Sequence, residues 1–321
     1  MTPAEMEKRI VRYGDLQPCK TAFIDAHTPG SDQKENFTII GGGVSESPDQ
    51  HVHIGIPHGF NIGAAGQPPR VRNSLHDHHT AEAFFVLSGR WRFFWGRWGK
   101  AGEVTLEVGD IINIPTGIFR GFENIGTDYG MIMAVLGGDD AGGGVMWAPQ
   151  VIEDAAEHGL VLAETGKLYD TKKGANLPDG VKPMPLMTEA ELAKRPEPTT
   201  ADVLPNHVAR YWDMVALADK KPVLVIGEKG LLRDKPGFEV AFITNRSASE
   251  EKHSHKVPSV LMPVKGHWRV DWDGGSATLA AGDTMSVPEN IGHSVVPSMT
   301  GEAALYHIVA TGDPAGHTWK G

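Results

Sequence analysis

The sequence predicts an all-β protein in which one structural unit occurs twice. Two segments, one around residue 76 and one around residue 253, share a pattern of His, Gly, Asp and Pro positions. Between these positions lie short apolar runs rich in β-branched and aromatic residues, which favour strands. The 39 Gly and 22 Pro residues of the 321-residue chain suit many tight turns between short strands.

The two copies agree in the spacing of their histidines and turn residues. Each opens with a His-x-His pair, His76 with His78 and His253 with His255, and the members of such a pair share one face of a strand. The further matched positions are Glu82 with Ser259, Gly89 with Gly266, Gly109-Asp110 with Gly282-Asp283, Pro115 with Pro288, and Arg120 with His293. Agreement at this many positions indicates a duplicated unit rather than chance.

The first copy carries a candidate metal site. His76, His78 and Glu82 can converge on one point, and two imidazoles with a carboxylate suit a divalent transition metal. Arg120 stands where the second copy has a histidine, and a guanidinium cannot serve as a ligand. We expect Arg120 to bind a substrate carboxylate in a catalytic role. The alternative is a buried ion pair between Arg120 and Glu82, which would abolish the metal site.

The second copy carries a different set of ligands. His253, His255 and His293 provide three imidazoles, and Ser259 stands in place of the carboxylate. Three protein ligands hold a metal and leave coordination positions open, which catalysis requires. Ser259 is then expected to hydrogen-bond a bound water or the substrate. This set is the preferred active centre, and the reverse assignment, with the first copy catalytic, is nearly as well supported.

These positions resemble the two motifs of the cupin family, a Gly-bounded H-x-H-x(3,4)-E-x(6)-G and a following G-x(5)-P-x-G-x(2)-H-x(3)-N. The resemblance implies a bicupin, with two double-stranded β-helix (jelly-roll) barrels in one chain and a few short helices in the N-terminus and the connector. Each copy departs from the family pattern at one ligand, Arg120 in the first and Ser259 in the second. Cupins include dioxygenases, decarboxylases, isomerases, storage proteins and sensors, so the resemblance specifies the fold more closely than the function.

Two classes of function follow from the resemblance. The first is a metal-dependent dioxygenase, similar to bicupins of the quercetinase and gentisate dioxygenase type, in which Fe(II) holds a small phenolic, diol or organic-acid substrate beside O2. The second is a non-oxidative isomerase, lyase or small-molecule-binding protein with Zn, Ni or Mn. Cu is a further possible metal for either. A storage bicupin is disfavoured, because such proteins usually lose the motif histidines and this chain keeps five of six.

Composition limits the partners and the compartment. A net charge of −10 argues against nucleic acid and anionic membranes as partners. No apolar run approaches the roughly 20 residues of a transmembrane helix, and the N-terminus does not resemble a signal peptide. Cys19 is the only cysteine, which fits a reducing compartment, so a cytoplasmic location is expected. The resemblance also implies self-association into dimers or larger assemblies.

Short helices are predicted only outside the two barrels. Residues 3–12 should form one, with Thr2 as its N-cap, and residues 149–158 and 188–195 should form two more in the connector. The connector is expected to pack on the barrels or on a partner subunit rather than hang free. The predicted divisions are an N-terminal barrel with its leading helix at 1–147, a helical and Pro-rich connector at 148–205, and a C-terminal barrel at 206–321.

The remaining histidines lack the motif spacing. His51 and His53 form another alternating pair without a downstream carboxylate, and we interpret them as ordinary strand or interface histidines rather than ligands. His79, His267 and His307 lie near the motifs in sequence but are placed outside the ligand sets.

Overall fold

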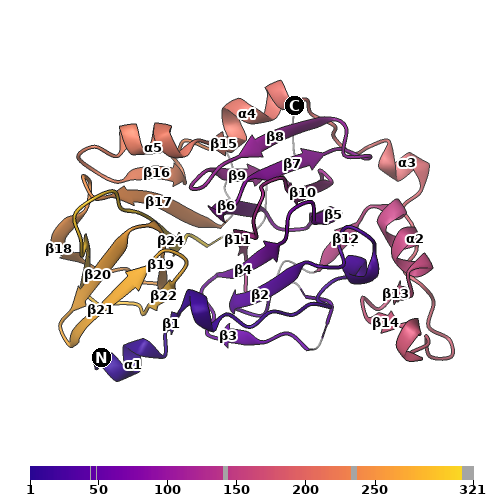
Figure 1. Cartoon of the computed structure of the whole chain (residues 1–321), viewed down its shortest axis with the longest axis horizontal. Coiled ribbons are helices and arrows are strands. Elements are labelled where there is room, and N and C mark those ends of the chain that lie inside the picture. The colour runs from indigo at the N-terminus through magenta and orange to yellow at the C-terminus, as the bar shows by residue number, and fades with distance from the viewer. Residues whose placement is uncertain (44, 48, 140–143, 233–236, 313–321) are drawn as a thin grey trace.

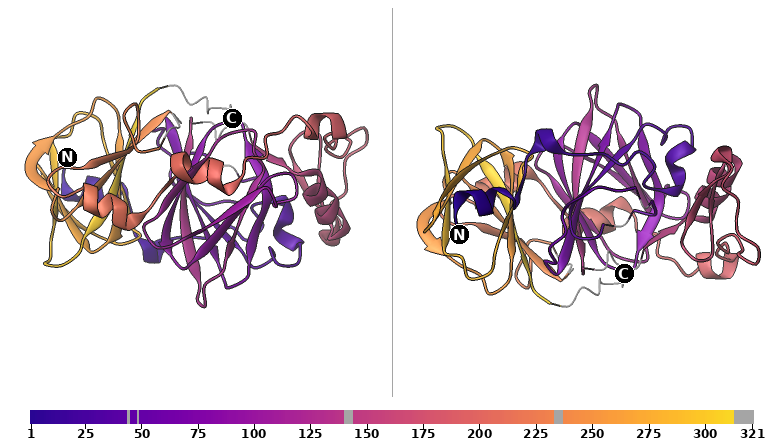
Figure 2. Two further views of the ribbon diagram at one scale, coloured as in Figure 1. Left: turned by 90° about the horizontal axis from the view of Figure 1, so that it is seen from above. Right: turned by 90° about the horizontal axis from the view of Figure 1, so that it is seen from below.

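Two β-barrels and a connector lie in a row in the computed structural model of the chain (Figure 1, Figure 2). The structure describes residues 1–43, 45–47, 49–139, 144–232 and 237–312. Strands dominate and the helices are few and short, which confirms the predicted all-β class. Within these ranges, no helix has the length and apolar character needed to cross a membrane.

The first barrel consists of two sheets packed face to face. Its strands are β2 (Glu35–Ile40), β3 (Val52–Ile54), β4 (Phe60–Gln67), β5 (Arg72–His78), β6 (Glu82–Ser88), β7 (Trp91–Trp95), β8 (Gly102–Leu106), β9 (Ile111–Ile114), β10 (Arg120–Asn124), β11 (Gly130–Gly137), β12 (Val145–Trp147) and β15 (Val208–Ala209). The larger sheet has the order β15-β9-β6-β11-β4-β2-β3, and the smaller one β12-β5-β10-β7-β8. Alternate residues of a strand point into the barrel, so Trp91, Phe93 and Trp95 of β7 are fully buried in its core.

The second barrel repeats this plan with fewer strands. They are β1 (Ile10–Val11), β16 (Val223–Ile226), β17 (Phe238–Thr244), β18 (Ser249–His253), β19 (Ser259–Lys265), β20 (His267–Trp272), β21 (Gly275–Ala280), β22 (Thr284–Val287), β23 (His293–Pro297) and β24 (Ala304–Ala310). The two sheets have the orders β1-β22-β19-β24-β17-β16 and β18-β23-β20-β21. β20 corresponds to β7, and its Trp268, Val270 and Trp272 are buried in the same alternating way.

Each barrel receives an edge strand from the segment that precedes the other barrel. β1 lies before the first barrel and pairs with β22 of the second, while β15 lies before the second barrel and pairs with β9 of the first. The predicted helix at 3–12 is therefore too long. It ends at Glu7, as α1 (Pro3–Glu7) with Thr2 as N-cap, and Ile10 and Val11 extend to complete a sheet. The predicted boundaries at 147 and 205 stay predictions, and these exchanged strands lie across them.

An Arg-Tyr pair follows each exchanged strand and docks on the Gly-Asp turn of the barrel that receives it. Asp283 accepts hydrogen bonds from the backbone N–H of Tyr13 at 3.0 Å and from Arg12 at 3.1 Å. Asp110 accepts the corresponding bonds from Tyr211 and Arg210, both at 2.8 Å. The duplicated unit thus includes the segments before both barrels, with the pattern Arg-Tyr-x-Asp at 12–15 and 210–213.

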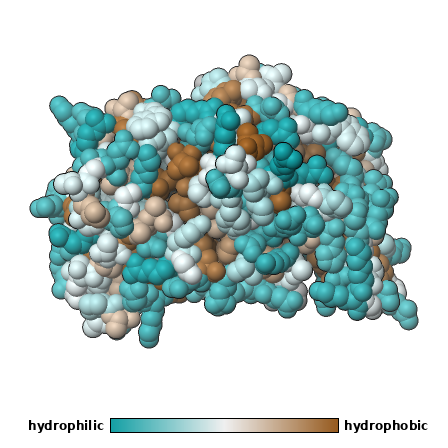
Figure 3. Space-filling view, viewed as in Figure 1, coloured by the Kyte–Doolittle hydropathy of each residue, from teal (hydrophilic) through white to brown (hydrophobic). Residues whose placement is uncertain are grey.

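The larger sheets of the two barrels face each other and share one hydrophobic core. The rings of Phe85 and Tyr306, one from each barrel, are 4.4 Å apart between centroids. The Tyr306 hydroxyl donates a hydrogen bond to the Gly109 carbonyl at 2.5 Å. Figure 3 shows hydrophobic residues gathered over the seam between the barrels on one face, with mostly hydrophilic residues toward the ends. The two barrels are therefore expected to unfold together.

The connector packs on the first barrel, one of the two arrangements expected. Its elements are α2 (Pro149–Glu157), β13 (Leu160–Leu162), β14 (Leu168–Asp170), η4 (Thr171–Lys173), α3 (Glu189–Leu192) and α4 (Thr200–His207). Val151, Leu160 and Leu192 join a hydrophobic cluster with Phe119 and Trp147. The 3-10 helices η1 (Tyr13–Asp15) and η2 (Ile24–His27) and the helix α5 (Tyr211–Leu217) complete the fold. The sequence analysis predicted no helix at the positions of α4 and α5.

Because the leading segment completes the second barrel, Met6, the buried residue of α1, should matter to the stability of the whole chain. Met6 is 1% exposed and packs in the core of the second barrel. We expect Met6→Ala to lower the free energy of unfolding by about 2–4 kcal/mol in one cooperative urea transition. Met299→Ala, at a position that is 64% exposed, is the matched control and should change it by less than about 0.5 kcal/mol. Two separate transitions, with only one shifted, would show that the barrels unfold independently.

Candidate metal centres

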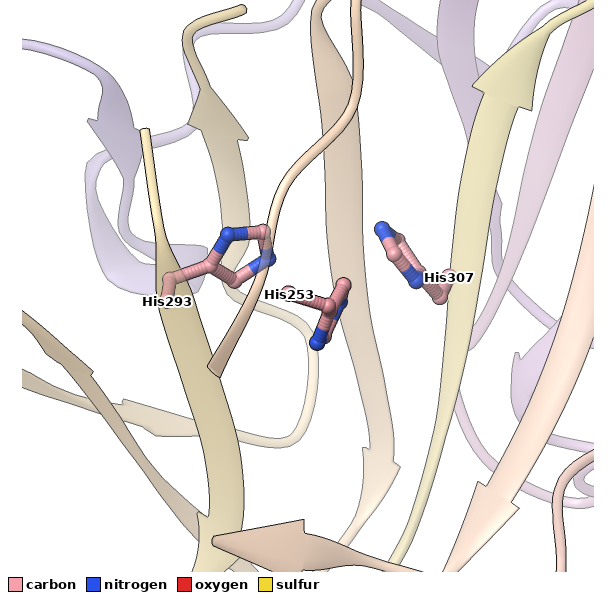
Figure 4. Close-up of side chains that lie close together, drawn as sticks. All are labelled: His253, His293 and His307. Carbon is pink, nitrogen blue, oxygen red and sulfur yellow. The ribbon is translucent and has the colours of Figure 1, made fainter. Parts of the chain in front are cut away.

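Three histidines from three strands of the second barrel form a compact cluster. They are His253 at the end of β18, His293 at the start of β23 and His307 on β24. One ring nitrogen of each lies within 4.8 Å of the others. Figure 4 shows their rings close together in the space between the strands. Nitrogens at this spacing can bind a single metal ion.

His255 brings a fourth imidazole to the same place. Its ring centroid lies 4.9 Å from that of His307 and 5.4 Å from that of His253. The Nε2 atoms of His255, His293 and His307 are buried without a hydrogen-bond partner within the described part of the chain. His293 Nδ1 lies 3.0 Å from the Ile291 carbonyl, so the N–H is held there and Nε2 keeps its lone pair. Buried ring nitrogens that lack hydrogen-bond partners are suited to bind a metal.

The environment keeps these imidazoles neutral. Burial lowers the pKa of His253, and burial together with the nearby His253 ring lowers the pKa of His255. Burial lowers the pKa of His293 to about 4 and places that of His307 well below its usual range. Neutral imidazole is the form that binds metals, so the cluster is ready to do so at neutral pH without first losing protons.

His307 reaches the cluster because of the register between β19 and β24. His307 lies directly opposite Leu261, two residues after Ser259, so it shares the inner face with the position that lost its carboxylate. In the first barrel the same register places Ala134 opposite Phe84, two residues after Glu82. The second barrel has therefore exchanged a carboxylate on one strand for an imidazole on its neighbour. The sequence feature that could have identified His307 as a ligand is that it aligns with Ala134 of the first copy. This alignment becomes visible once the strand register is known.

In the first barrel, the structure brings together the three predicted ligands. His76 and His78 at the end of β5 and Glu82 at the start of β6 lie with one ligand atom each within 4.8 Å of the others, and all three are buried. The Ser74 carbonyl lies 2.8 Å from His76 Nδ1, which leaves Nε2 toward the cluster. Burial and the Arg120 charge place the pKa of both imidazoles well below the usual range.

Arg120 occupies this site as an internal cation. Its Nη2 donates to Glu82 at 2.8 Å and its Nη1 to Asp77 at 2.9 Å, and Arg120 is 1% exposed. Asp77 is held from the other side by Arg195 at 2.9 Å. The observed arrangement is thus the buried ion pair given as the alternative in the sequence analysis. Both Nη atoms are engaged, so this arrangement gives no support to Arg120 as a clamp for a substrate carboxylate.

Comparison with known proteins agrees with this architecture. Residues 66–136, most of the first barrel, match the family model described as Cupin domain. The fold resembles an oxalate decarboxylase from Lactobacillus farciminis in complex with formate, at a TM-score of 0.54 and 14% identity over 96% of this chain and 88% of that one. It also resembles an oxalate decarboxylase from Bacillus subtilis, at a TM-score of 0.51 and 15% identity over 97% of this chain and 79% of that one.

The match of the first barrel to a cupin model, together with a second barrel of the same plan, establishes the fold. The chain has a bicupin fold, with two barrels of cupin type. No curated protein matches its sequence significantly. At 14–15% identity the structural likeness concerns the fold, so the reaction has to be inferred from the bicupin's own residues.

Of the histidines that lack the motif spacing, His53 and His267 lie outside the two clusters, whereas His307 lies inside one. His53 is engaged at both ring nitrogens, with the Thr38 carbonyl 2.7 Å from Nδ1 and the Gln17 N–H donating to Nε2 at 3.1 Å. Its interpretation as an ordinary strand histidine therefore agrees with its contacts. His267 lies exposed on β20, outside the cluster. His307, which the sequence analysis placed outside the ligand sets, lies inside one.

A buried carboxyl near the first site gives the bicupin a pH-dependent stability. Burial raises the pKa of Glu46 to about 7, although Trp147 and the Ile24 N–H donate hydrogen bonds to it. The folded state therefore holds a proton that the unfolded state releases near pH 4.5, so this group's contribution to stability falls as pH rises from about 4.5 to 7. We expect Glu46→Gln to flatten the fall in unfolding free energy across that window by about 1–3 kcal/mol. An unchanged pH profile in urea denaturation would contradict the assignment.

Proposed function

We propose that this bicupin is a divalent-metal-dependent enzyme that carries out a non-oxidative reaction, of lyase or isomerase type, on a small organic acid. The reaction centre is the second barrel. The observation that supports it is the cluster of His253, His293 and His307, to which the neighbouring ring of His255 is assigned as a fourth imidazole. Mn, Ni or Zn is the proposed ion, since these metals accept nitrogen ligands and the four donors carry no charge.

The number of ligands favours a non-oxidative reaction. Four protein ligands leave two positions on a six-coordinate ion, and a chelating substrate fills both. An oxygenase that also brings O2 to the ion needs a third. Three imidazoles, as the sequence analysis assumed, would leave that third position, whereas His255 and His307 together remove it. This is why the Fe(II) dioxygenase, the first hypothesis from the sequence, now stands second.

The residues around the cluster suit an anionic substrate. When bound, a divalent ion would act as a Lewis acid that polarises a carboxylate or carbonyl oxygen. Four neutral imidazoles leave the ion's double positive charge uncompensated, which attracts an acid. His253 is exposed, so this side of the cluster is open to solvent for substrate entry. Ser259 lies diagonally across from His307 on the neighbouring strand, and we assign its hydroxyl to hydrogen-bond a substrate oxygen.

Oxalate is the first substrate to test, because the structures of similar fold are named oxalate decarboxylases. Its cleavage to CO2 and formate balances without an external oxidant, in keeping with a non-oxidative centre. Other small mono- and dicarboxylic acids come next. Self-association and a cytoplasmic location remain predictions from the sequence.

A single experiment separates the two candidate functions. Purified protein, stripped of metal and reloaded separately with Mn, Ni, Zn or Fe(II), is incubated with each acid, with and without O2. Product formation and O2 consumption are both measured. We expect turnover that persists without O2 and disappears with a chelator, and His267→Ala should behave as wild type. Turnover only with Fe(II) and matched O2 consumption would reject the non-oxidative proposal in favour of the dioxygenase. No turnover and no stoichiometric metal would reject both.

A further inference from the structure

The first barrel contains a cavity of about 70 Å³ that the reaction proposed for the second barrel does not use. By the space that one water requires, this is room for about five water-sized groups, close to the size of one six-membered ring. Its polar lining residues include His76, His78 and Glu82, together with Asn36, Asn61 and Asn73. Its walls are mainly apolar and include Phe23, Phe37, Phe84, Phe122, Ile132 and Trp147.

The cavity exists because small residues face inward on two neighbouring strands. Gly63 and Ala65 of β4 pair with Ala134 and Ile132 of β11, and all four line the cavity. Their alternation places them on the same face of the sheet as the Glu82 position.

The second barrel carries larger side chains at the corresponding positions. By the register of β17, β19 and β24, Ala65 corresponds to Ile243 and Ala134 to His307. The position that carries the imidazole of His307 in the second barrel therefore carries the small Ala134 in the first, where it leaves room for the cavity. Larger side chains therefore occupy this space in the second barrel, whereas the small side chains of the first barrel leave a cavity.

The three predicted ligands that line this cavity are poorly suited to a metal ion. Arg120 donates to Glu82 at 2.8 Å and is fixed in place by Asp77. A dication at the three predicted ligands would share Glu82 with this buried guanidinium, and the two like charges would repel at short range in a low-dielectric interior. With Glu82 already paired, the imidazoles of His76 and His78 are among the polar lining groups that can exchange hydrogen bonds with a ligand.

We propose that the first barrel is a metal-independent binding site for a small monocyclic phenol, with its ring against the apolar walls and its hydroxyl hydrogen-bonded to His76 or His78. An aromatic ring matches the Phe and Trp side chains of the wall. A hydroxyl both donates and accepts, so it suits neutral imidazoles, whereas a carboxylate would place a second negative charge beside Glu82. Binding in the first barrel is independent of the reaction proposed for the second.

The test uses p-cresol as the probe on the full-length protein. Its binding is measured by titration calorimetry and by saturation-transfer NMR, on metal-loaded and chelator-treated protein. Two variants fill the cavity, Ala134→Leu and Ala65→Ile, the second of which places the residue that the other barrel already has. His307→Ala is the matched control that alters only the second barrel. Metal content and circular dichroism show that each variant is folded.

We expect p-cresol to bind at one site per chain, equally with and without metal, and equally in His307→Ala. Both filling variants should weaken it at least about tenfold, the effect of closing a pocket that matches one ring, while their metal content stays at the wild-type level. Binding that is lost on metal removal or in His307→Ala would place the probe in the second barrel and overturn the proposal. Binding that both filling variants leave unchanged, or no binding at about 10 mM probe, weaker than a ligand of eight heavy atoms should show, would overturn it as well.

Discussion

Replacing His307 with alanine should weaken metal binding to the second barrel by more than about 100-fold, because loss of an outer partner of a ligand alone costs 10–100-fold. The ring nitrogen of His307 lies within 4.8 Å of those of His253 and His293, and it is buried without another partner in the described part of the chain. The affinity for Mn²⁺ and Zn²⁺ is measured by competition with a chromophoric chelator.

The matched control for this variant is His267→Ala. His267 lies on β20 of the same barrel but is exposed and outside the cluster, so its loss should leave the affinity within about twofold, as expected of a surface change. A wild-type affinity in His307→Ala would mean that His253, His255 and His293 hold the metal alone, as the sequence predicted.

His255→Ala then decides the number of ligands. If it weakens binding as strongly as His307→Ala, the site has four imidazoles and two open positions, which suits the non-oxidative reaction. If it leaves the affinity unchanged, the site has three ligands, and an oxygenase regains the position that it needs for O2. The prediction is that both variants weaken binding.

Arg120→Met should lower the free energy of unfolding by about 3–5 kcal/mol, because it leaves the buried Glu82 carboxylate without its cation. Arg120 is 1% exposed and joins Glu82 to Asp77, which are themselves buried. Methionine keeps much of the side-chain volume, so the change reports charge rather than a cavity. The effect is measured by urea denaturation of metal-free protein, so that metal binding does not enter.

Arg90→Met provides the comparison for an exposed ion pair. Arg90 donates to Glu107 at 2.9 Å, but both side chains are more than half exposed. Solvent screens such a pair, and its loss should cost less than about 1 kcal/mol. Equal and small effects of both substitutions would show that Arg120 does not compensate the buried carboxylates, and the first barrel would again be open to a metal.

The sequence by itself determined the features that depend on local spacing. His76 and His78 share one face because they are two residues apart on a strand, and the same holds for His253 and His255. Gly109 has a φ of +86°, where glycine is tolerated best, so the Gly-Asp turns could be recognised in both copies. These regularities were sufficient to predict two barrels of cupin type, in which five of the six aligned positions carry a histidine and the sixth carries Arg120.

Tertiary structure decided which distant groups meet. His307 enters the cluster through the register between two strands that are far apart in sequence, and register is set by how the inner faces pack. Arg120 pairs with Glu82, and its position also depends on its hydrogen bond to Asp77. Asp77 is in turn bound by Arg195 of the connector.

The exchange of edge strands was equally hidden from local reasoning. From the sequence, Ile10 and Val11 were predicted to end a helix. They form a strand because they pair with the edge strand β22 of the second barrel. The Arg-Tyr-x-Asp pattern at 12–15 and 210–213 was present in the sequence, but it gains meaning from the Gly-Asp turn on which each copy docks. Local spacing therefore determined which secondary structures and ligand pairs each segment could form. Burial, ion pairing and the pairing of strand edges between distant segments determined which of these possibilities the folded chain adopts.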